Sequence, residues 1–151
     1  CDVFLRRGKM QQQAFREWRD AIVEFTRYLK CKPSSADAYL LRGQLQEKLG
    51  ELDTAIADFR KATKLNPRFA KAYAANAYTQ LRKRKPNEKK ARALLLKAIR
   101  FDKKLAHPYF LLCNMVKERN KSVARRYCQT YLRLAPKGDY AETAKDLLRS
   151  L

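Results

Sequence analysis

The sequence predicts an all-α fold, an α-solenoid of helix-turn-helix repeats that ends in a capping helix. The first observation is internal periodicity, because Ala21 and Pro33 each have a counterpart 34 residues further along the chain, at Ala55 and Pro67. The second is composition, because four glycines and five prolines among 151 residues leave little material for the turns of a β-sheet. The third is that apolar residues recur at helical spacing, while no run approaches the roughly 18 apolar residues of a membrane-spanning helix.

Residues 36–69 show most clearly how one repeat folds. Gly43 and Ala55 are small residues near the middle of two consecutive helical segments, so the two helices can approach closely there. Gly50 lies between the segments and can adopt the left-handed conformation that ends a helix. Pro67 stops the second segment, because proline cannot continue a helix. The stretch therefore predicts a helical hairpin, which must stack on neighbouring hairpins to bury its apolar face.

This stretch resembles a tetratricopeptide repeat, a family in which each repeat of 34 residues forms two antiparallel helices. The family's signature positions are occupied here by Tyr39, Gly43, Gly50, Ala55, Phe59, Ala62 and Pro67. The resemblance implies a right-handed solenoid that acts as a protein–protein interaction scaffold, without catalysis or cofactor, within a larger assembly. Polar residues replace large apolar ones at four family positions and predict polar contacts between repeats: Arg42, Gln46, Asn76 and Gln80.

Looser repeats flank this one, and together they predict a single domain over residues 1–151. The flanking repeats cover residues 2–35, 70–105 and 106–138. The turn within residues 2–35 holds one extra residue, and the turn within residues 70–105 holds two. We expect a last helix, over residues 140–151, to cap the stack by covering the open apolar edge of the final hairpin.

Net charge is distributed unevenly along the chain. Lysine and arginine number 35 against 15 aspartates and glutamates, which gives a net charge of +20. Residues 1–69 carry 14 basic and 9 acidic side chains, whereas residues 70–151 carry 21 and 6, so the second part alone has a net charge of +15. Charge of this size exceeds what solubility requires and indicates acidic partners or surfaces.

In arrays of this family the first helices of successive hairpins line a concave groove, where ligands bind. One face of the predicted first helices has an apolar middle and basic flanks, which suits an acidic, amphipathic helix or an extended peptide of a partner protein. The candidate groove residues are Leu40, Leu41, Gln44, Lys48, Lys71, Tyr78, Arg82, Phe110, Leu111 and Asn114. A second interpretation stays open, in which these residues are partly buried by stacking or covered by the terminal helix.

A second candidate site is a basic edge over residues 82–104, extended by basic residues in and near the next turn. Such an edge suits the phosphates of RNA or DNA, anionic membrane lipids or an acidic protein surface. The candidate polyanion-binding residues are Lys83, Arg84, Lys85, Lys89, Lys90, Arg119, Lys121, Arg125 and Arg126. A solvated run of charges without a ligand explains the same pattern, and the segment RKRKP also fits a nuclear import signal.

Motifs for catalysis and metal binding are missing from the sequence. One histidine, no glycine-rich phosphate loop and no nucleophile motif leave no residue to name as acid, base or nucleophile. The four cysteines form no C-x-x-C pair, and only His107 could join them as a ligand, so no familiar metal-site spacing is present. The sequence therefore predicts a protein that is not an enzyme and takes no metal, cofactor or small-molecule substrate.

The cysteines bear on the compartment. Cys113 and Cys128 fall on the two predicted helices of one hairpin, where a disulfide is compatible with the fold, but the sequence favours free, buried cysteines that act as small hydrophobic residues. This interpretation predicts a reducing compartment and a cytoplasmic protein, with a nuclear location as one alternative. Cys1 suggests another, a bacterial lipoprotein anchored to the membrane through its acylated first cysteine.

Overall fold

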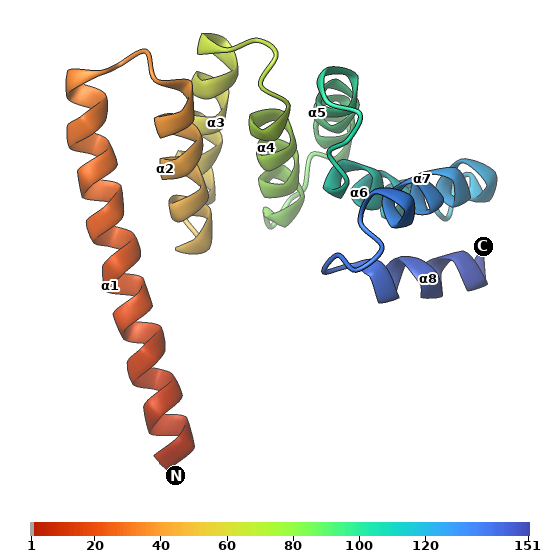
Figure 1. Cartoon of the computed structure of the whole chain (residues 1–151), viewed down its shortest axis with the longest axis horizontal. Coiled ribbons are helices and arrows are strands. Elements are labelled where there is room, and N and C mark those ends of the chain that lie inside the picture. The colour runs from red at the N-terminus through yellow and green to blue at the C-terminus, as the bar shows by residue number, and fades with distance from the viewer. Residues whose placement is uncertain (1) are drawn as a thin grey trace. The chain divides into compact units, whose positions relative to one another are not determined.

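The computed structural model describes the backbone of residues 2–151 and the side chains of residues 14–151. The described backbone forms eight α-helices and no strand, which confirms the predicted all-α class (Figure 1). The helices are α1 (Asp2–Cys31), α2 (Ala36–Lys48), α3 (Leu52–Leu65), α4 (Ala70–Arg82), α5 (Glu88–Phe101), α6 (His107–Val116), α7 (Lys121–Leu134) and α8 (Ala141–Ser150).

The helices group into two compact units, residues 1–67 with α1 to α3 and residues 68–151 with α4 to α8. The single domain expected over residues 1–151 stays a prediction. Within the units the hairpins α2/α3, α4/α5 and α6/α7 correspond to the repeats read from the sequence.

The α2/α3 hairpin is built as its two glycines predict. A Cβ atom on Gly43 would lie 2.7 Å from Cε1 of Phe59 and 3.2 Å from the carbonyl oxygen of Ala55, so a larger residue there would push the helices apart. Gly50, between α2 and α3, has a φ of +80°, the left-handed conformation that side chains with a Cβ rarely adopt. The close approach of the two helices and the turn between them are both confirmed.

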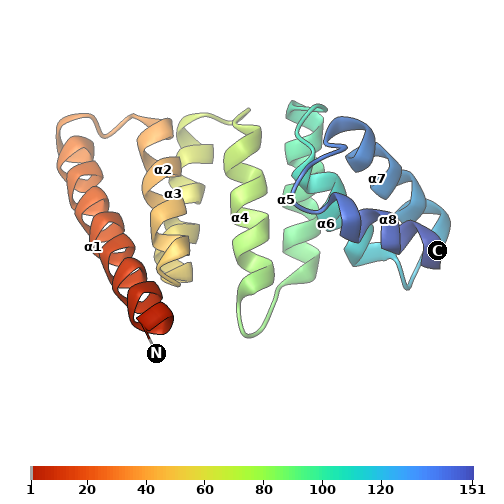
Figure 2. The ribbon, with the colours of Figure 1, turned by 60° about the horizontal axis from the view of Figure 1, so that its bottom comes forward.

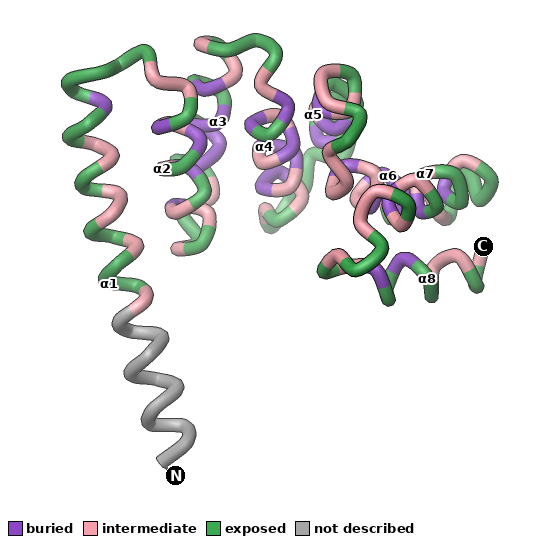
Figure 3. The backbone as a smooth tube through the Cα atoms, in the orientation of Figure 1, coloured by how far each residue is buried: buried purple, intermediate pink, exposed green. Residues whose placement is uncertain are grey.

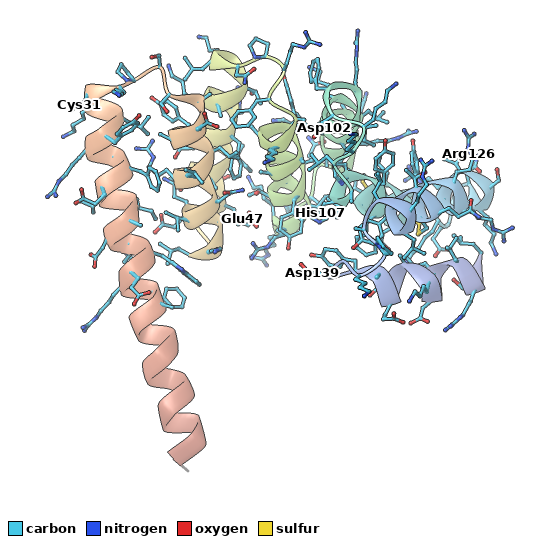
Figure 4. All side chains as sticks on the ribbon, viewed as in Figure 1. Cys31, Glu47, Asp102, His107, Arg126 and Asp139 are labelled. Carbon is cyan, nitrogen blue, oxygen red and sulfur yellow. A yellow bond between two sulfur atoms is a disulfide. The ribbon has the colours of Figure 1, made fainter. Side chains whose placement is uncertain are left out.

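Equivalent positions hold the other two hairpins together. In α4/α5 the glycine–phenylalanine contact is replaced by Ala77 and Leu95, which are fully buried members of one core cluster. In α6/α7 it is replaced by Cys113 and Cys128, which form a disulfide with their Cα atoms 5.4 Å apart (Figure 4). The interpretation of these cysteines as free thiols is therefore wrong. Their pairing follows from the repeat, because the two positions face each other in every hairpin.

The N-terminal repeat differs from its prediction. α1 is one continuous helix of 30 residues, so the expected turn within residues 2–35 is not formed. A turn needs a residue that ends a helix, and the position 34 residues before Gly50 is occupied by Arg16, a good helix former. α1 packs on α2, and most of its described side chains are exposed or half-buried while Leu29 is buried (Figure 3).

An ion pair that is largely buried joins the three helices of residues 1–67. Arg42 of α2 donates hydrogen bonds from Nε and Nη2 to the two carboxylate oxygens of Asp58 in α3, both at 2.7 Å. Its Nη1 atom donates a third, of 3.1 Å, to the hydroxyl of Thr26 in α1. The Asp58 side chain is 8% exposed, and its hydrogen bonds to Arg42 raise the pKa of the guanidinium. The hydrogen bond from Arg42 to Thr26 confirms the predicted polar contact between repeats at Arg42. Gln80 instead donates a hydrogen bond to Asn76 within the same helix, α4.

The last helix packs on the hairpin before it. α8 lies beside α7 (Figure 2), with Ala141 and Ala144 buried against it. Leu147, Leu148 and Leu151 pack on the core cluster formed by α6 and α7. The packing expected of residues 140–151 on the α6/α7 hairpin is thus present, and the role of this helix as a cap of the array stays a prediction.

We expect the disulfide to contribute about 3 kcal/mol to the stability of residues 68–151, because it closes a loop of roughly 15 residues in the unfolded chain. Urea unfolding of the oxidised and reduced full-length protein, followed by circular dichroism, measures the difference. Cys31→Ala serves as the control, since Cys31 is exposed and free. Equal midpoints for the oxidised and reduced protein would contradict the prediction.

We expect Arg42→Ala to cost about 3–5 kcal/mol of unfolding free energy, because it leaves the Asp58 carboxylate buried without its partner. The double variant Arg42→Met, Asp58→Leu should cost much less, since it removes both charges and fills their volume. Chemical denaturation of the three proteins tests this order. A double variant that is less stable than Arg42→Ala would show that the charges themselves stabilise the unit.

Candidate functional site

The candidate groove residues of α2 differ in exposure. Leu41, Gln44 and Lys48 lie at i, i+3 and i+7 on one face of the helix and are all exposed, Leu41 by 45%. Leu40 points into the core and is buried, so it does not belong to this accessible face. The Nζ atom of Lys48 lies 5.4 Å from the ring centre of Trp18 in α1. Residues 1–67 thus present a face of α2 with an apolar centre and a basic end.

In residues 68–151 the candidate groove residues lie on α4 and α6, which contact each other. Lys71, Arg82 and Asn114 are exposed. Tyr78 and Leu111 are half-buried, and Phe110 is buried. The Arg82 guanidinium lies 5.7 Å from the ring centre of Tyr78. The Tyr78 ring in turn lies 5.4 Å from the ring of His107, at the start of α6.

Tyr140, immediately before α8, covers the middle of this α4–α6 face. Its ring stacks on Phe110 with the centroids 4.4 Å apart and on His107 with the centroids 5.3 Å apart. The backbone N–H of Tyr140 donates a 3.1 Å hydrogen bond to the hydroxyl of Tyr131, and a Cβ atom on Gly138 would lie 2.6 Å from that hydroxyl. Phe110 is therefore covered by the segment that leads into α8, as the second interpretation of the groove residues expected.

His107 lies in this aromatic cluster, where its surroundings disfavour the charged imidazolium form. Burial lowers its pKa, and attraction to the carboxylate of Asp139 offsets part of that effect. Figure 4 labels both residues, His107 at the start of α6 and Asp139 in the segment that leads to α8. The Nε2 atom is buried and has no hydrogen-bond partner among the described residues, so a proton added there would gain no acceptor.

The basic edge is accessible. Eight of its nine candidate residues are exposed, and Lys83 is half-buried. They lie in the loop between α4 and α5, in the first turn of α5, and around the start of α7, where Figure 4 labels Arg126. The eight exposed side chains of this edge are therefore accessible to an anionic ligand.

A pocket opens within this edge, between α5 and the turn that joins α6 to α7, and sequence reasoning missed it. It has a volume of about 650 Å³. Its apolar lining, which defines the edge pocket, consists of Ala93, Leu96, Met115, Val116 and Val123. One sequence signal could have found it: Lys89, Arg92, Ala93 and Leu96 recur at i, i+3, i+4 and i+7, a second face of α5 beside its core stripe.

Metal sites and membrane-spanning helices are both missing from the part of the chain that the structure describes. No three His, Cys, Asp or Glu side chains among those residues gather in a way that could hold a metal ion. None of the helices there combines the length and the apolar character that crossing a bilayer requires.

Comparison with known proteins assigns the repeat. Residues 36–69 match the model of the tetratricopeptide repeat family. No match is found among curated protein sequences. The repeat read from the sequence is thus confirmed as a tetratricopeptide repeat, and the fold class as an all-α solenoid of helical repeats.

Solved structures with similar folds support the same class. MamA aligns with 99% of this chain and 84% of its own at 18% identity and a TM-score of 0.70. YrrB, described as a TPR protein with an unusual peptide-binding site, aligns with 82% of this chain and 62% of its own at 22% identity and a TM-score of 0.71. The Arabidopsis OM64 TPR domain aligns with 77% of this chain and 95% of its own at 22% identity and a TM-score of 0.65. Likeness at these identities shows the fold alone.

We expect the stability of residues 68–151 to fall as the pH decreases through the ordinary histidine pKa of about 6.5. The pKa of His107 is lowered by folding, so the unfolded chain binds the proton more readily and acid favours unfolding, whereas the stability is fully present at higher pH. His107→Phe keeps a ring between Tyr78 and Tyr140 and removes the titration. Urea unfolding from about pH 5 to about pH 8 should show a weaker pH dependence for the variant. Parallel curves for the two proteins would contradict this assignment.

Proposed function

We propose that this protein is a non-catalytic scaffold that binds a segment of a partner protein on the exposed face of α2. The observation that carries the proposal is the 45% exposure of Leu41, which lies in the middle of a tetratricopeptide-repeat helix whose other two leucines, Leu40 and Leu45, are buried and half-buried. A large apolar side chain exposed to this extent is available for contact with a partner. Gln44 and Lys48 continue the same face and supply polar and basic contacts for an acidic, amphipathic segment.

The class of fold supports this proposal. Tetratricopeptide repeats are interaction modules, and YrrB, which shares the fold, is described as having a peptide-binding site. In residues 68–151 the exposed Lys71, Arg82 and Asn114 offer further polar contacts on first helices. Phe110 is covered by Tyr140, so we assign it no direct contact with the partner.

Polyanion binding is the second candidate function. The observation that favours it is the exposure of eight of the nine basic-edge residues, for which folding offers no reason. RNA, DNA, an anionic membrane and an acidic protein surface all present charges that such an edge would attract.

The disulfide changes what can be proposed about the compartment. Structural disulfides persist in oxidising compartments and are rare in cytosolic proteins. The cytoplasmic location rested on free cysteines, and the bond between Cys113 and Cys128 removes that basis. We therefore favour an oxidising compartment for this protein.

Capture of partners on the immobilised full-length chain at moderate salt, with and without nuclease, tests the two functions. We expect a protein that stays bound after nuclease treatment and is lost about tenfold or more on Leu41→Glu, because a charge then enters an apolar contact. Ala57→Glu, an exposed change of the same charge on α3, is the control and should bind normally. Circular dichroism checks that both variants remain helical.

Two outcomes would contradict the scaffold proposal. Material that is released by nuclease and lost when Arg84, Lys85, Lys89 and Lys90 are changed to glutamine would assign the function to polyanion binding. In that case the logarithm of the binding constant should fall with the logarithm of the salt concentration, with a slope on the order of 4. Binding that Leu41→Glu leaves unchanged would remove the α2 face from the site.

A further inference from the structure

The edge pocket is an apolar surface that packing of the hairpins does not close. α5 packs into the core of residues 68–151 through its stripe of Ala91, Leu95 and Ala98, all fully buried. Ala93 and Leu96 lie outside that stripe and line the pocket instead, and Leu96 is 43% exposed. A large apolar side chain left in solvent beside a cavity of about 650 Å³ is available for contact with another molecule.

The opposite wall of the pocket is firmly supported. Val116 is buried in the core formed by α6 and α7, and Met115 and Val123 pack partly against the same core. The same three side chains also line the pocket. The pocket is thus a preformed depression with an apolar interior, and binding there would order few additional apolar side chains.

Positive charge surrounds this apolar interior. Lys89, Arg92 and Arg119 line the pocket together with one carboxylate, that of Glu88. The N-termini of α5 and α7 meet the pocket, at Glu88 and at Asn120, which accepts a hydrogen bond from the Val123 N–H, and the C-terminus of α6 meets it at Val116. Helix N-termini and C-termini carry partial charges of opposite sign, so the net positive charge of the pocket comes from its side chains.

We infer that the edge pocket binds an acidic segment of a partner protein, which inserts a large apolar side chain beside Leu96. The carboxylates of that segment would lie against Lys89, Arg92 and Arg119. The inference rests on the proposed function as an interaction scaffold and adds a second contact surface, separate from the α2 face. The pocket's charge selects an acidic ligand, and its apolar lining requires one that also carries an apolar side chain.

The lining favours a protein segment over a nucleic acid. None of the ten residues that line the pocket is aromatic, so no platform for base stacking is present. A phosphate backbone would contact the three cations and leave the apolar interior unused. A leucine, isoleucine or phenylalanine flanked by glutamate or aspartate satisfies both parts of the pocket.

Selection from a peptide library tests the inference without knowledge of the natural partner. The full-length protein is presented with phage-displayed random peptides of about 15 residues, long enough for about four helical turns. Peptides retained by wild-type protein and lost on Leu96→Glu should be acidic and should carry at least one large apolar residue. Their affinity should fall about tenfold or more with Leu96→Glu or with the double variant Arg92→Glu, Arg119→Glu. Arg100→Glu, an exposed change on α5 outside the pocket lining, should leave it unchanged.

A second readout shows where a selected peptide binds. The chain holds two methionines, Met10 and Met115, so its methyl-labelled methionine spectrum has two signals. Addition of the peptide should shift the signal of Met115, which lines the pocket, and the shift should disappear in Leu96→Glu. An unmoved Met115 signal at saturating peptide, or an oligonucleotide of thymidines that produces the same shift and competes with the peptide, would overturn the inference.

The outcomes also separate this inference from the proposed function. Selected peptides that depend on Leu41 and not on Leu96 would leave the scaffold function standing and remove the edge pocket from it. Failure to enrich any peptide on the full-length protein would count against both. Neutral or basic peptides that depend on Leu96 would show that the pocket binds protein segments but would overturn the assignment of an acidic ligand.

Discussion

Contact between the two helices of each hairpin, made at one pair of facing positions, is the constraint on which the rest of the structure depends. Where the first helix has glycine, the second has the ring of Phe59; where the first has alanine, the second has leucine; and the third hairpin has cysteine at both. The sizes compensate, as a close-packed interior requires. The disulfide is therefore a chemical variant of a packing contact that every hairpin must make.

This packing also decides which surfaces remain for binding. Each helix gives one stripe to its hairpin partner and its neighbours, and what lies outside the stripe faces solvent. On α2 the result is an accessible face around Leu41, and on α5 it is the wall of the edge pocket around Leu96. On α6 the residue equivalent to Leu41 is Leu111, which is half-buried, and its neighbour Phe110 is enclosed by Tyr140 and Tyr131. The two accessible surfaces therefore share an origin while differing in charge and shape.

The sequence predicted those parts of the fold that local chemistry determines. Gly50 gives its turn because of its left-handed φ, and the spacing of small and apolar residues places the three hairpins and the capping helix. The prediction of a turn within residues 2–35 was wrong. Ala21 and Pro33 match the repeat, but no residue near Arg16 ends a helix. The groove residues were chosen by helical register alone. Register cannot show that Tyr140 folds back onto Phe110, since that contact depends on the short segment after α7 and on Gly138 within it.

Tyr140 and α8 have a consequence for how an array of this kind changes in length. Repeat proteins evolve by duplication and loss of whole hairpins, each of which stacks on the one before it. A hairpin inserted directly after α7 would need the surface that α8 and the ring of Tyr140 already occupy. Duplication of the α6/α7 hairpin would therefore have to carry residues 138–151 along, so that the tyrosine stack is rebuilt on the first helix of the added hairpin.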